Sequence, residues 1–155
     1  MCIKKQTIDG GTGGDMRKIV NRSNQKVTSW FGMRKGFKLF HKGVDLRTWT
    51  DDFKKKLIVV LPEDAVFIRS VYQKKWGWTH VFKGLESGYT LKFTHLEERA
   101  FIKGHEYNEG FAVGNTIVTT YMKKKKLGDH LHFEVWNKLF MNPIKYFKKM
   151  EVSYG

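Results

Sequence analysis

The sequence predicts a mainly β fold, in a single domain built on an antiparallel β-sheet and followed by a short C-terminal helix. Two observations support this prediction. The chain has 15 glycines against two prolines in 155 residues, which is typical of many turns and bulges. Its β-forming segments are also joined by connections too short for the helical crossovers that parallel strands need. A chain of this length can bury one core of its own.

Runs of β-branched and aromatic residues between turn signals predict strands along most of the chain. The predicted strands lie within residues 26–34, 37–46, 57–61, 65–73, 78–84, 89–96, 116–122 and 130–136. The apolar run 57–61, which Pro62 ends, suits a buried strand. Residues 78–84 and 89–96 are typical of a hairpin with Gly88 in its turn.

The two ends of the chain have different compositions. Residues 1–25 are polar and include the glycine-rich stretch DGGTGGD, which predicts a tail or a first short strand with a loop. The domain is therefore expected to span residues 26–155. Near the C-terminus, NPIKYFKKM predicts a short helix, in which Asn142 is the N-cap and Pro143 is the first helical residue.

The charge and the hydropathy pattern limit the possible partners. The formal net charge is +14, from 29 basic and 15 acidic side chains, which indicates an anionic partner such as nucleic acid, an acidic membrane or a bacterial wall. No apolar run approaches the roughly 18 residues of a membrane span, and no secretory signal is predicted at the N-terminus. Cys2 is the only cysteine, so no internal disulfide is predicted.

The stretch GDHLHFEVW places two of the six histidines one residue apart. In a strand, alternate residues point to the same face. His130, His132, Glu134 and Trp136 would then share one face, and the apolar residues between them would face the core. Two imidazoles side by side can belong to a metal site, although two surface histidines on an edge strand would give the same pattern.

A zinc site needs about three protein ligands, and a catalytic one leaves the fourth position open. His41 and Asp45, in HKGVD, would share a face of a strand. With one histidine of the pair they could form an open zinc site, which leaves the other histidine beside the metal for proton transfer or charge stabilisation. His95, at the end of another predicted strand, could be a second such group. His105 is expected in a loop, and His80 in a structural or surface role.

Three motifs in this order resemble those of the lysostaphin-type zinc endopeptidases, which cut peptide bonds in bacterial peptidoglycan. The motifs are FHKGVDL, GYTLKFTHL and GDHLHFEVW, and the similarity extends over roughly residues 26–147. The resemblance implies a substrate groove over one face of the sheet. It implies one zinc ion per chain, bound by His41, Asp45 and His132, with His95 and His130 as the catalytic histidines. Glu134 shares the face of His132 and could support this zinc ligand through a hydrogen bond.

Two segments depart from the family pattern and affect the expected specificity. RTWTDDFKKK follows GVDL where a loop of small residues with Pro and Gly is usual. NTIVTTYMKKKKLGD stands in place of a glycine-rich stretch, with Asp129 where proline is common. Because these regions shape the groove in the family, the bond that is cut is left open, between glycine cross-bridges and bonds around the D-alanine and diamino-acid cross-link. The lysines at 123–126 are expected in a solvated loop that could steer an anionic wall.

Together these features predict a zinc-dependent endopeptidase that hydrolyses peptide cross-links of bacterial peptidoglycan. Without a predicted signal peptide, the protein is expected in a phage virion or to be released from the host cytoplasm by phage lysis, and to act on the cell wall. One alternative is an inactive wall-binding or structural virion protein on the same fold. A basic nucleic-acid-binding β domain is the other, and it would make the His/Asp pattern a coincidence.

Overall fold

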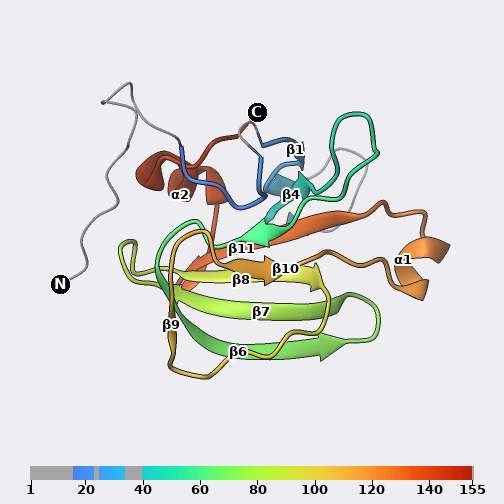
Figure 1. Ribbon diagram of the computed structural model, residues 1–155. Helices are drawn as coiled ribbons and strands as arrows, with labels where there is room; N and C mark the ends of the chain where they lie inside the picture. The colour runs from blue at the N-terminus through green and yellow to red at the C-terminus, as the bar shows by residue number, and fades with distance from the viewer. Residues whose placement is uncertain (1–15, 23–24, 34–39, 155) are drawn as a thin grey trace.

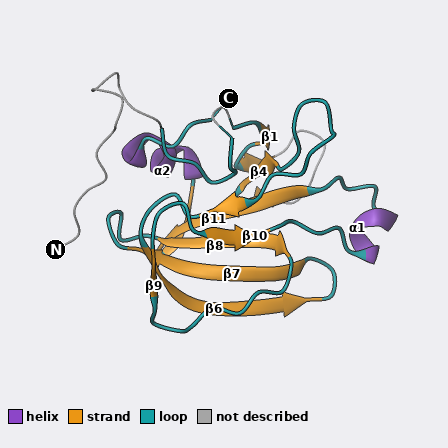
Figure 2. Cartoon of the chain, viewed as in Figure 1, coloured by secondary structure: helices purple, strands orange, loops and turns teal. Residues whose placement is uncertain are grey.

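A computed structural model describes residues 16–22, 25–33 and 40–154. It confirms a mainly β chain with antiparallel pairing (Figures 1 and 2). The main sheet has eight strands, in the order β1-β4-β11-β8-β7-β6-β9, with β12 paired to β11. They are β1 (Val27–Ser29), β4 (Val44–Arg47), β6 (Ala65–Gln73), β7 (Gly77–Gly84), β8 (Thr90–Leu96), β9 (Glu106–Tyr107), β11 (His130–Asn137) and β12 (Leu139–Met141).

Two short antiparallel pairs and two helices complete the described elements. The strand β5 (Val59–Val60) pairs with β10 (Ala112–Gly114), and β2 (Gly32–Met33) pairs with β3 (Phe40–His41). The helices are α1 (Thr120–Lys124) and α2 (Pro143–Met150). Figure 1 shows α1 beyond one end of the main sheet. No helix of the described residues is long and apolar enough to cross a membrane.

The core lies against one face of the main sheet. On β11, Leu131, Phe133 and Val135 are fully buried, while the residues between them are partly exposed on the other face. The helix α2 covers this buried face, since the rings of Tyr146 and Phe147 lie 5.9 and 6.1 Å from the ring of Phe133. The apolar face of the strand therefore anchors it, and its polar face stays accessible.

Several predicted elements are found with their predicted bounds or close to them. The strand β6 spans the predicted residues, and β7 and β8 form the predicted hairpin, with Gly88 in the left-handed region at φ +78°. The cap of α2 is also as predicted, because the side chain of Asn142 accepts a hydrogen bond of 3.1 Å from the backbone N–H of Ile144. Pro143 is the first residue of that helix.

The predicted strand at 116–122 is wrong. Thr119 caps the short helix α1, and its hydroxyl accepts a hydrogen bond of 3.1 Å from the N–H of Met122. Burial of Met122 anchors this turn of helix, which overrides the β propensity of the neighbouring residues. Lys123 and Lys124 belong to the last turn of α1, so the predicted loop at 123–126 begins as helix.

Three other predicted strands are shorter than expected or divided. The segment 26–34 contains β1 and β2, which are separated at Trp30 and Phe31. Within 57–61 only Val59 and Val60 form a strand. The predicted strand at 37–46 is divided after His41; its residues 37–39 lie outside the described part of the chain. Gly43 stands at the division because the backbone there passes against the carbonyl of Phe133, and a Cβ at this position would overlap that oxygen. This close approach brings His41 and β4 onto β11.

The described part of the predicted tail is joined to the domain. Ile19 and Val20 are fully buried in the core. The buried amide of Gln25 accepts hydrogen bonds of 2.7 and 2.6 Å from their backbone N–H groups and donates one of 2.5 Å to the carbonyl of Ser153. Residues 16–22 therefore pack with the domain, whereas residues 1–15 of the predicted tail lie outside the described residues.

Candidate active site

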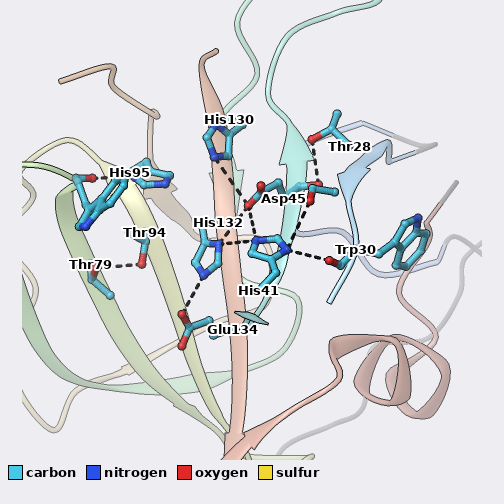
Figure 3. A network of polar contacts seen from close by, with 12 residues as sticks. Thr28, Trp30, His41, Asp45, Thr79, Thr94, His95, His130, His132 and Glu134 are labelled. Atoms are coloured by element: carbon cyan, nitrogen blue, oxygen red, sulfur yellow. Dashed lines mark hydrogen bonds and ion pairs between the residues drawn. The ribbon is translucent and has the colours of Figure 1, made fainter. Parts of the chain in front are cut away.

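The strands β4 and β11 lie side by side and carry most of the candidate site (Figure 3). Their antiparallel register places Asp45 directly opposite His132, and Arg47 opposite His130. His41 reaches the same place from β3, four residues before Asp45. The alternation predicted for the HLH segment is thus present, with both histidines on the partly exposed face of β11.

Three atoms of this cluster form a nearly equilateral triangle. Nε2 of His41 lies 3.2 Å from Oδ1 of Asp45 and 3.2 Å from Nδ1 of His132, and the third edge, from His132 Nδ1 to Asp45 Oδ1, is 3.0 Å. Ligands bound at about 2.0–2.1 Å around a tetrahedral zinc ion lie roughly 3.3 Å apart. The triangle therefore has nearly the size of one face of a zinc tetrahedron, and these three side chains could hold a metal ion.

The hydrogen bonds behind the triangle set the ring tautomers that a metal needs. Nδ1 of His41 lies 2.8 Å from the carbonyl oxygen of Trp30, which can only accept, so Nδ1 carries the proton and Nε2 presents a lone pair. Nε2 of His132 lies 2.8 Å from a carboxylate oxygen of Glu134, which leaves Nδ1 of His132 for the triangle. Both rings are thus oriented from behind, as in known metal sites.

His130 and His95 are oriented in the same manner, each by a backbone carbonyl. Nδ1 of His130 donates to the carbonyl of Gly128 at 2.7 Å, and Nδ1 of His95 donates to that of Trp76 at 2.8 Å. The two rings lie 4.8 Å apart, and Nε2 of His130 is 3.7 Å from Oδ1 of Asp45. Two imidazoles thus stand next to the triangle, each with Nε2 available.

A β-bulge places His95 at the site. Strict alternation along β8 would direct His95 to the same face as the buried residues Leu91 and Phe93. The register of β8 with β7 shifts at this point, and His95 has a positive φ of 75°. Bulges commonly redirect side chains next to active sites, and a residue other than glycine in this conformation is strained. The distortion turns the imidazole toward His130 (Figure 3).

Burial and hydrogen bonds change the pKa values of these groups. Burial raises the pKa of Asp45, but hydrogen bonds with His132 and His41 outweigh it and hold the pKa well below its usual range. Burial lowers the pKa of His132, yet its bonds with Asp45 and Glu134 raise it to about 9 in the metal-free protein. Burial lowers the pKa of His95 to about 4, so this imidazole is neutral at pH 7.

The site opens into a groove of about 660 Å³ on the exposed face of the sheet. The groove crosses the strands β11, β8, β7 and β6, and a hydrogen bond of 2.9 Å joins Thr79 to Thr94 on its floor. A second hollow begins beyond Asp45 and His130 and is bordered by Arg47 and Trp49. The candidate site thus has open space on both sides.

The two departures from the family pattern meet at this second hollow. Asp129 accepts a hydrogen bond of 2.8 Å from the indole nitrogen of Trp49 and forms an ion pair of 2.9 Å with Lys56. The segment after β4 therefore borders the hollow together with the residue before His130. Asp129 therefore stabilises this border through its carboxylate. A proline at this position could form neither the hydrogen bond with Trp49 nor the ion pair with Lys56.

All five predicted site residues are brought together, and Glu134 takes the supporting position expected of it. Trp136, predicted on the same face of the strand, donates its indole N–H to Glu134 at 2.7 Å. The carbonyls of Trp30, Trp76 and Gly128 were missed, because a backbone carbonyl leaves no signal in a sequence. His105 is an exposed loop residue, as expected, and His80 is fully buried.

Comparison with solved structures identifies the fold. A chain of the SpoIIQ–SpoIIIAH pore-forming complex aligns with a TM-score of 0.66 and 19% identity, over 85% of this chain and 90% of that one. A zinc-containing peptidase from Vibrio cholerae gives 0.61 and 21%, over 82% and 38%. Lysostaphin from Staphylococcus simulans gives 0.59 and 19%, over 82% and 50%.

The chain has the fold of these proteins. Their low sequence identities establish the fold alone. No family model matches the sequence, and no curated protein is significantly similar to it in sequence. The resemblance to lysostaphin-type endopeptidases is therefore supported at the level of the fold. Any catalytic activity depends on the geometry of the candidate site.

Proposed function

We propose that this protein is a zinc-dependent endopeptidase that hydrolyses peptide cross-links of bacterial peptidoglycan. The proposal depends above all on the triangle formed by His41, Asp45 and His132, whose edges of 3.0–3.2 Å fit a tetrahedral metal. Two nitrogen ligands and one carboxylate with an open fourth position are typical of catalytic rather than structural zinc. The fold, which lysostaphin and a zinc-containing peptidase share, agrees with this chemistry.

When bound, zinc supplies a Lewis acid that polarises a carbonyl group and makes water nucleophilic near neutral pH. The chain's own part is proton transfer and orientation. Nε2 of His95 and Nε2 of His130 each present a lone pair, because the other nitrogen of each ring donates to a carbonyl. Such imidazoles can take a proton from water and deliver one to the leaving amine. In their protonated form they can also stabilise a developing oxyanion.

The surroundings of the site suit a peptide substrate. Open space continues on both sides of Asp45 and His130, so a chain can pass across the site in both directions. The net charge of +14 favours an anionic substrate such as a bacterial wall. Carriage in a phage particle or release by phage lysis stays a prediction from the sequence.

The deciding experiment measures zinc content and wall hydrolysis on the same preparations. The wild-type protein should contain one zinc ion per chain, and it should release new amino groups from purified peptidoglycan in a chelator-sensitive reaction. His132→Ala should lose both zinc and hydrolysis, because it removes a ligand. His95→Ala should keep zinc and lose hydrolysis by about 100-fold or more, which is the usual contribution of a general acid or base. A zinc-loaded wild-type protein that releases nothing would refute the proposal.

A non-catalytic binding or assembly protein is the second candidate. The observation in its favour is the similarity to a chain of the SpoIIQ–SpoIIIAH pore-forming complex. Against it stand the strained His95, the four oriented imidazoles and the metal-sized triangle, because a binding surface has no need for them. The same experiment separates the two, since a binding protein would retain wall affinity without releasing amino groups.

A further inference from the structure

The groove carries positive charge that the proposed catalytic machinery does not use. Its lining includes Lys42, Arg69 and Lys92. None of these three forms an ion pair with a residue that the structure describes. Among the described residues, the only carboxylates that line the groove are those of Asp45 and Glu134. Both form hydrogen bonds with His132. The groove therefore has an excess of positive charge beside the metal site.

The register of the sheet shows where these charges lie. Glu134 on β11 is opposite Lys92 on β8, Lys92 is opposite Val81 on β7, and Val81 is opposite Arg69 on β6. This row runs parallel to the row of His132 and lies two residues along the strands from it. Two residues of strand span about 7 Å. A group bound at the Lys92 end of this row is therefore about two residues of extended peptide away from the metal site. Arg69 lies two strands, or about 10 Å, further across the sheet, and its charge acts on Lys92.

Aromatic rings hold the two lysines at this end of the groove. Nζ of Lys92 lies 3.9 Å from the centre of the Trp136 ring, and Nζ of Lys42 lies 5.5 Å from that of Phe140. The two rings contact each other at 5.6 Å. Cation–π contacts of this kind fix the position of an ammonium group while leaving its N–H donors available. The lysines are thus held at this end of the groove. Glu134, the carboxylate opposite Lys92, interacts with its charge but forms its hydrogen bonds with His132 and Trp136.

We propose that Lys42, Arg69 and Lys92 form a carboxylate-binding subsite, and that the substrate carries a free carboxylate about two residues from the cleaved bond. This inference rests on the proposed peptidase function and narrows its substrate class. A run of glycine residues has no side-chain carboxylate and would leave three cations without a partner. A cross-linked peptide with acidic residues or free α-carboxylates would pair with them through charge-assisted hydrogen bonds.

The test compares two substrates that differ only in charge. One is a cross-linked stem-peptide dimer with free carboxylates, and the other is the same dimer with those carboxylates amidated. The wild-type protein should cleave the free acid with a kcat/KM about tenfold higher, mainly through a lower KM, since one charge-assisted bond is commonly worth that factor. Arg69→Gln and Lys92→Gln should each reduce this ratio toward one.

Lys83→Gln is the matched control. Lys83 lies on the same face of β7 as Val81, two residues further from the site, and it is exposed without lining the groove. The Lys83→Gln variant loses the same charge as Lys92→Gln. Its ratio of kcat/KM for the free-acid dimer to kcat/KM for the amidated dimer should equal that of the wild type. An equal loss of the ratio in Lys83→Gln would show a diffuse effect of net charge and would overturn the subsite. Equal kcat/KM for the two dimers in the wild type would also overturn it.

Binding of both dimers to the zinc-free protein separates this inference from the proposed function. Calorimetry should show tighter binding of the free acid, with the preference lost in Arg69→Gln. Preference in binding without hydrolysis in the zinc-loaded protein would support the subsite and refute the peptidase. Hydrolysis without preference would support the peptidase and refute the subsite. Competition by glycerol phosphate oligomers, with no preference between the dimers, would assign the cations to a wall phosphate and overturn the proposal.

Discussion

At the scale of single residues, the site depends on hydrogen bonds that lie behind the functional atoms. Each of the four histidines at the site has one nitrogen bonded to a carbonyl or carboxylate oxygen, so the other nitrogen faces the site. Three of these oxygens belong to the backbone and one to Glu134. Only the last can be tested by a conservative substitution.

Glu134→Gln should weaken zinc binding by about 10- to 100-fold, because the partner of the His132 imidazole loses its charge while the shape is kept. Competition with a chelator of known affinity measures this change. Glu98→Gln is the control, since Glu98 is exposed, lies just after β8 and does not line the groove. Equal zinc affinity in Glu134→Gln and the wild type would show that Glu134 does not support the ligand.

The buried position of His80 leads to a prediction about how the stability of the fold depends on pH. Its ring is fully buried, with Ser70 donating to Nδ1 at 2.6 Å and Nε2 donating to the carbonyl of Glu97 at 2.9 Å. Burial lowers its pKa, the carbonyl of Glu97 raises it, and the charge of Arg99 lowers it further. The unfolded chain therefore binds this proton more readily than the folded chain does.

Stability should accordingly fall as the pH drops below about 6.5, the pKa of histidine in an unfolded chain. Thermal unfolding of the metal-free protein between pH 6.5 and about pH 5 measures the loss, because above pH 6.5 His132, whose pKa is raised to about 9, contributes with the opposite sign. His95, whose pKa is also lowered by burial, contributes with the same sign. His80→Asn should show a smaller loss over this range than the wild type. An identical pH dependence in His80→Asn and the wild type would show that protonation of His80 does not cause the loss of stability.

At the scale of elements, the sequence predicted best where one face is apolar and the other polar. The alternation in 65–73 and in 130–136 predicted strands that the structure contains, because burial of one face fixes both the strand and its register. It failed at 116–122, where β-branched residues lie in a loop and a turn of helix anchored by Met122. Such a short helix has no periodicity to detect.

The cap of α2 gives a prediction about stability at this scale. Asn142→Ala should lower the free energy of unfolding by about 1 kcal/mol, because it removes the acceptor for the N–H of Ile144. In a domain of this size, that is a decrease of roughly 2–4 °C in Tm. Asn142→Asp retains an acceptor and should remain close to the wild type. A similar decrease in both variants would show that the amide has another role.

At the scale of the whole molecule, two distant segments bring together lysines beside the groove. Lys74 and Lys75 lie in the turn between β6 and β7, and Lys123 to Lys126 lie in and after α1. The hydroxyl of Thr119 donates to the carbonyl of Lys75 at 2.6 Å, and Nζ of Lys75 and of Lys125 lie 5.0 and 5.7 Å from the ring centre of Tyr121. We call these six residues the lysine cluster.

No residue of the lysine cluster has an ion pair within the described part of the chain, so the cluster should attract an anionic wall. Replacing Lys74, Lys75, Lys123 and Lys124 with glutamine should reduce association with purified walls and flatten its dependence on ionic strength. Sedimentation with walls from low to high salt measures both. Hydrolysis of a small soluble peptide should not change. Unchanged wall association would assign the attraction to charge elsewhere.

The sequence by itself determined the fold class, most strands of the sheet and the identity of the candidate site residues. These features depend on local patterns: alternation, turn residues, a helix cap, and motifs with chemically matched side chains. The second helix and its cap were also predictable, because Asn142 and Pro143 act on their immediate neighbours.

Only the tertiary structure decided the geometry of the site. The triangle of His41, Asp45 and His132 needs the register of β4 on β11 and the close approach at Gly43. His95 reaches the site through a bulge that contradicts the alternation of its strand. The row of Lys92 and Arg69 exists because β8, β7 and β6 are aligned. These relations join residues far apart in the chain, so packing of the whole sheet fixes them and no local pattern records them.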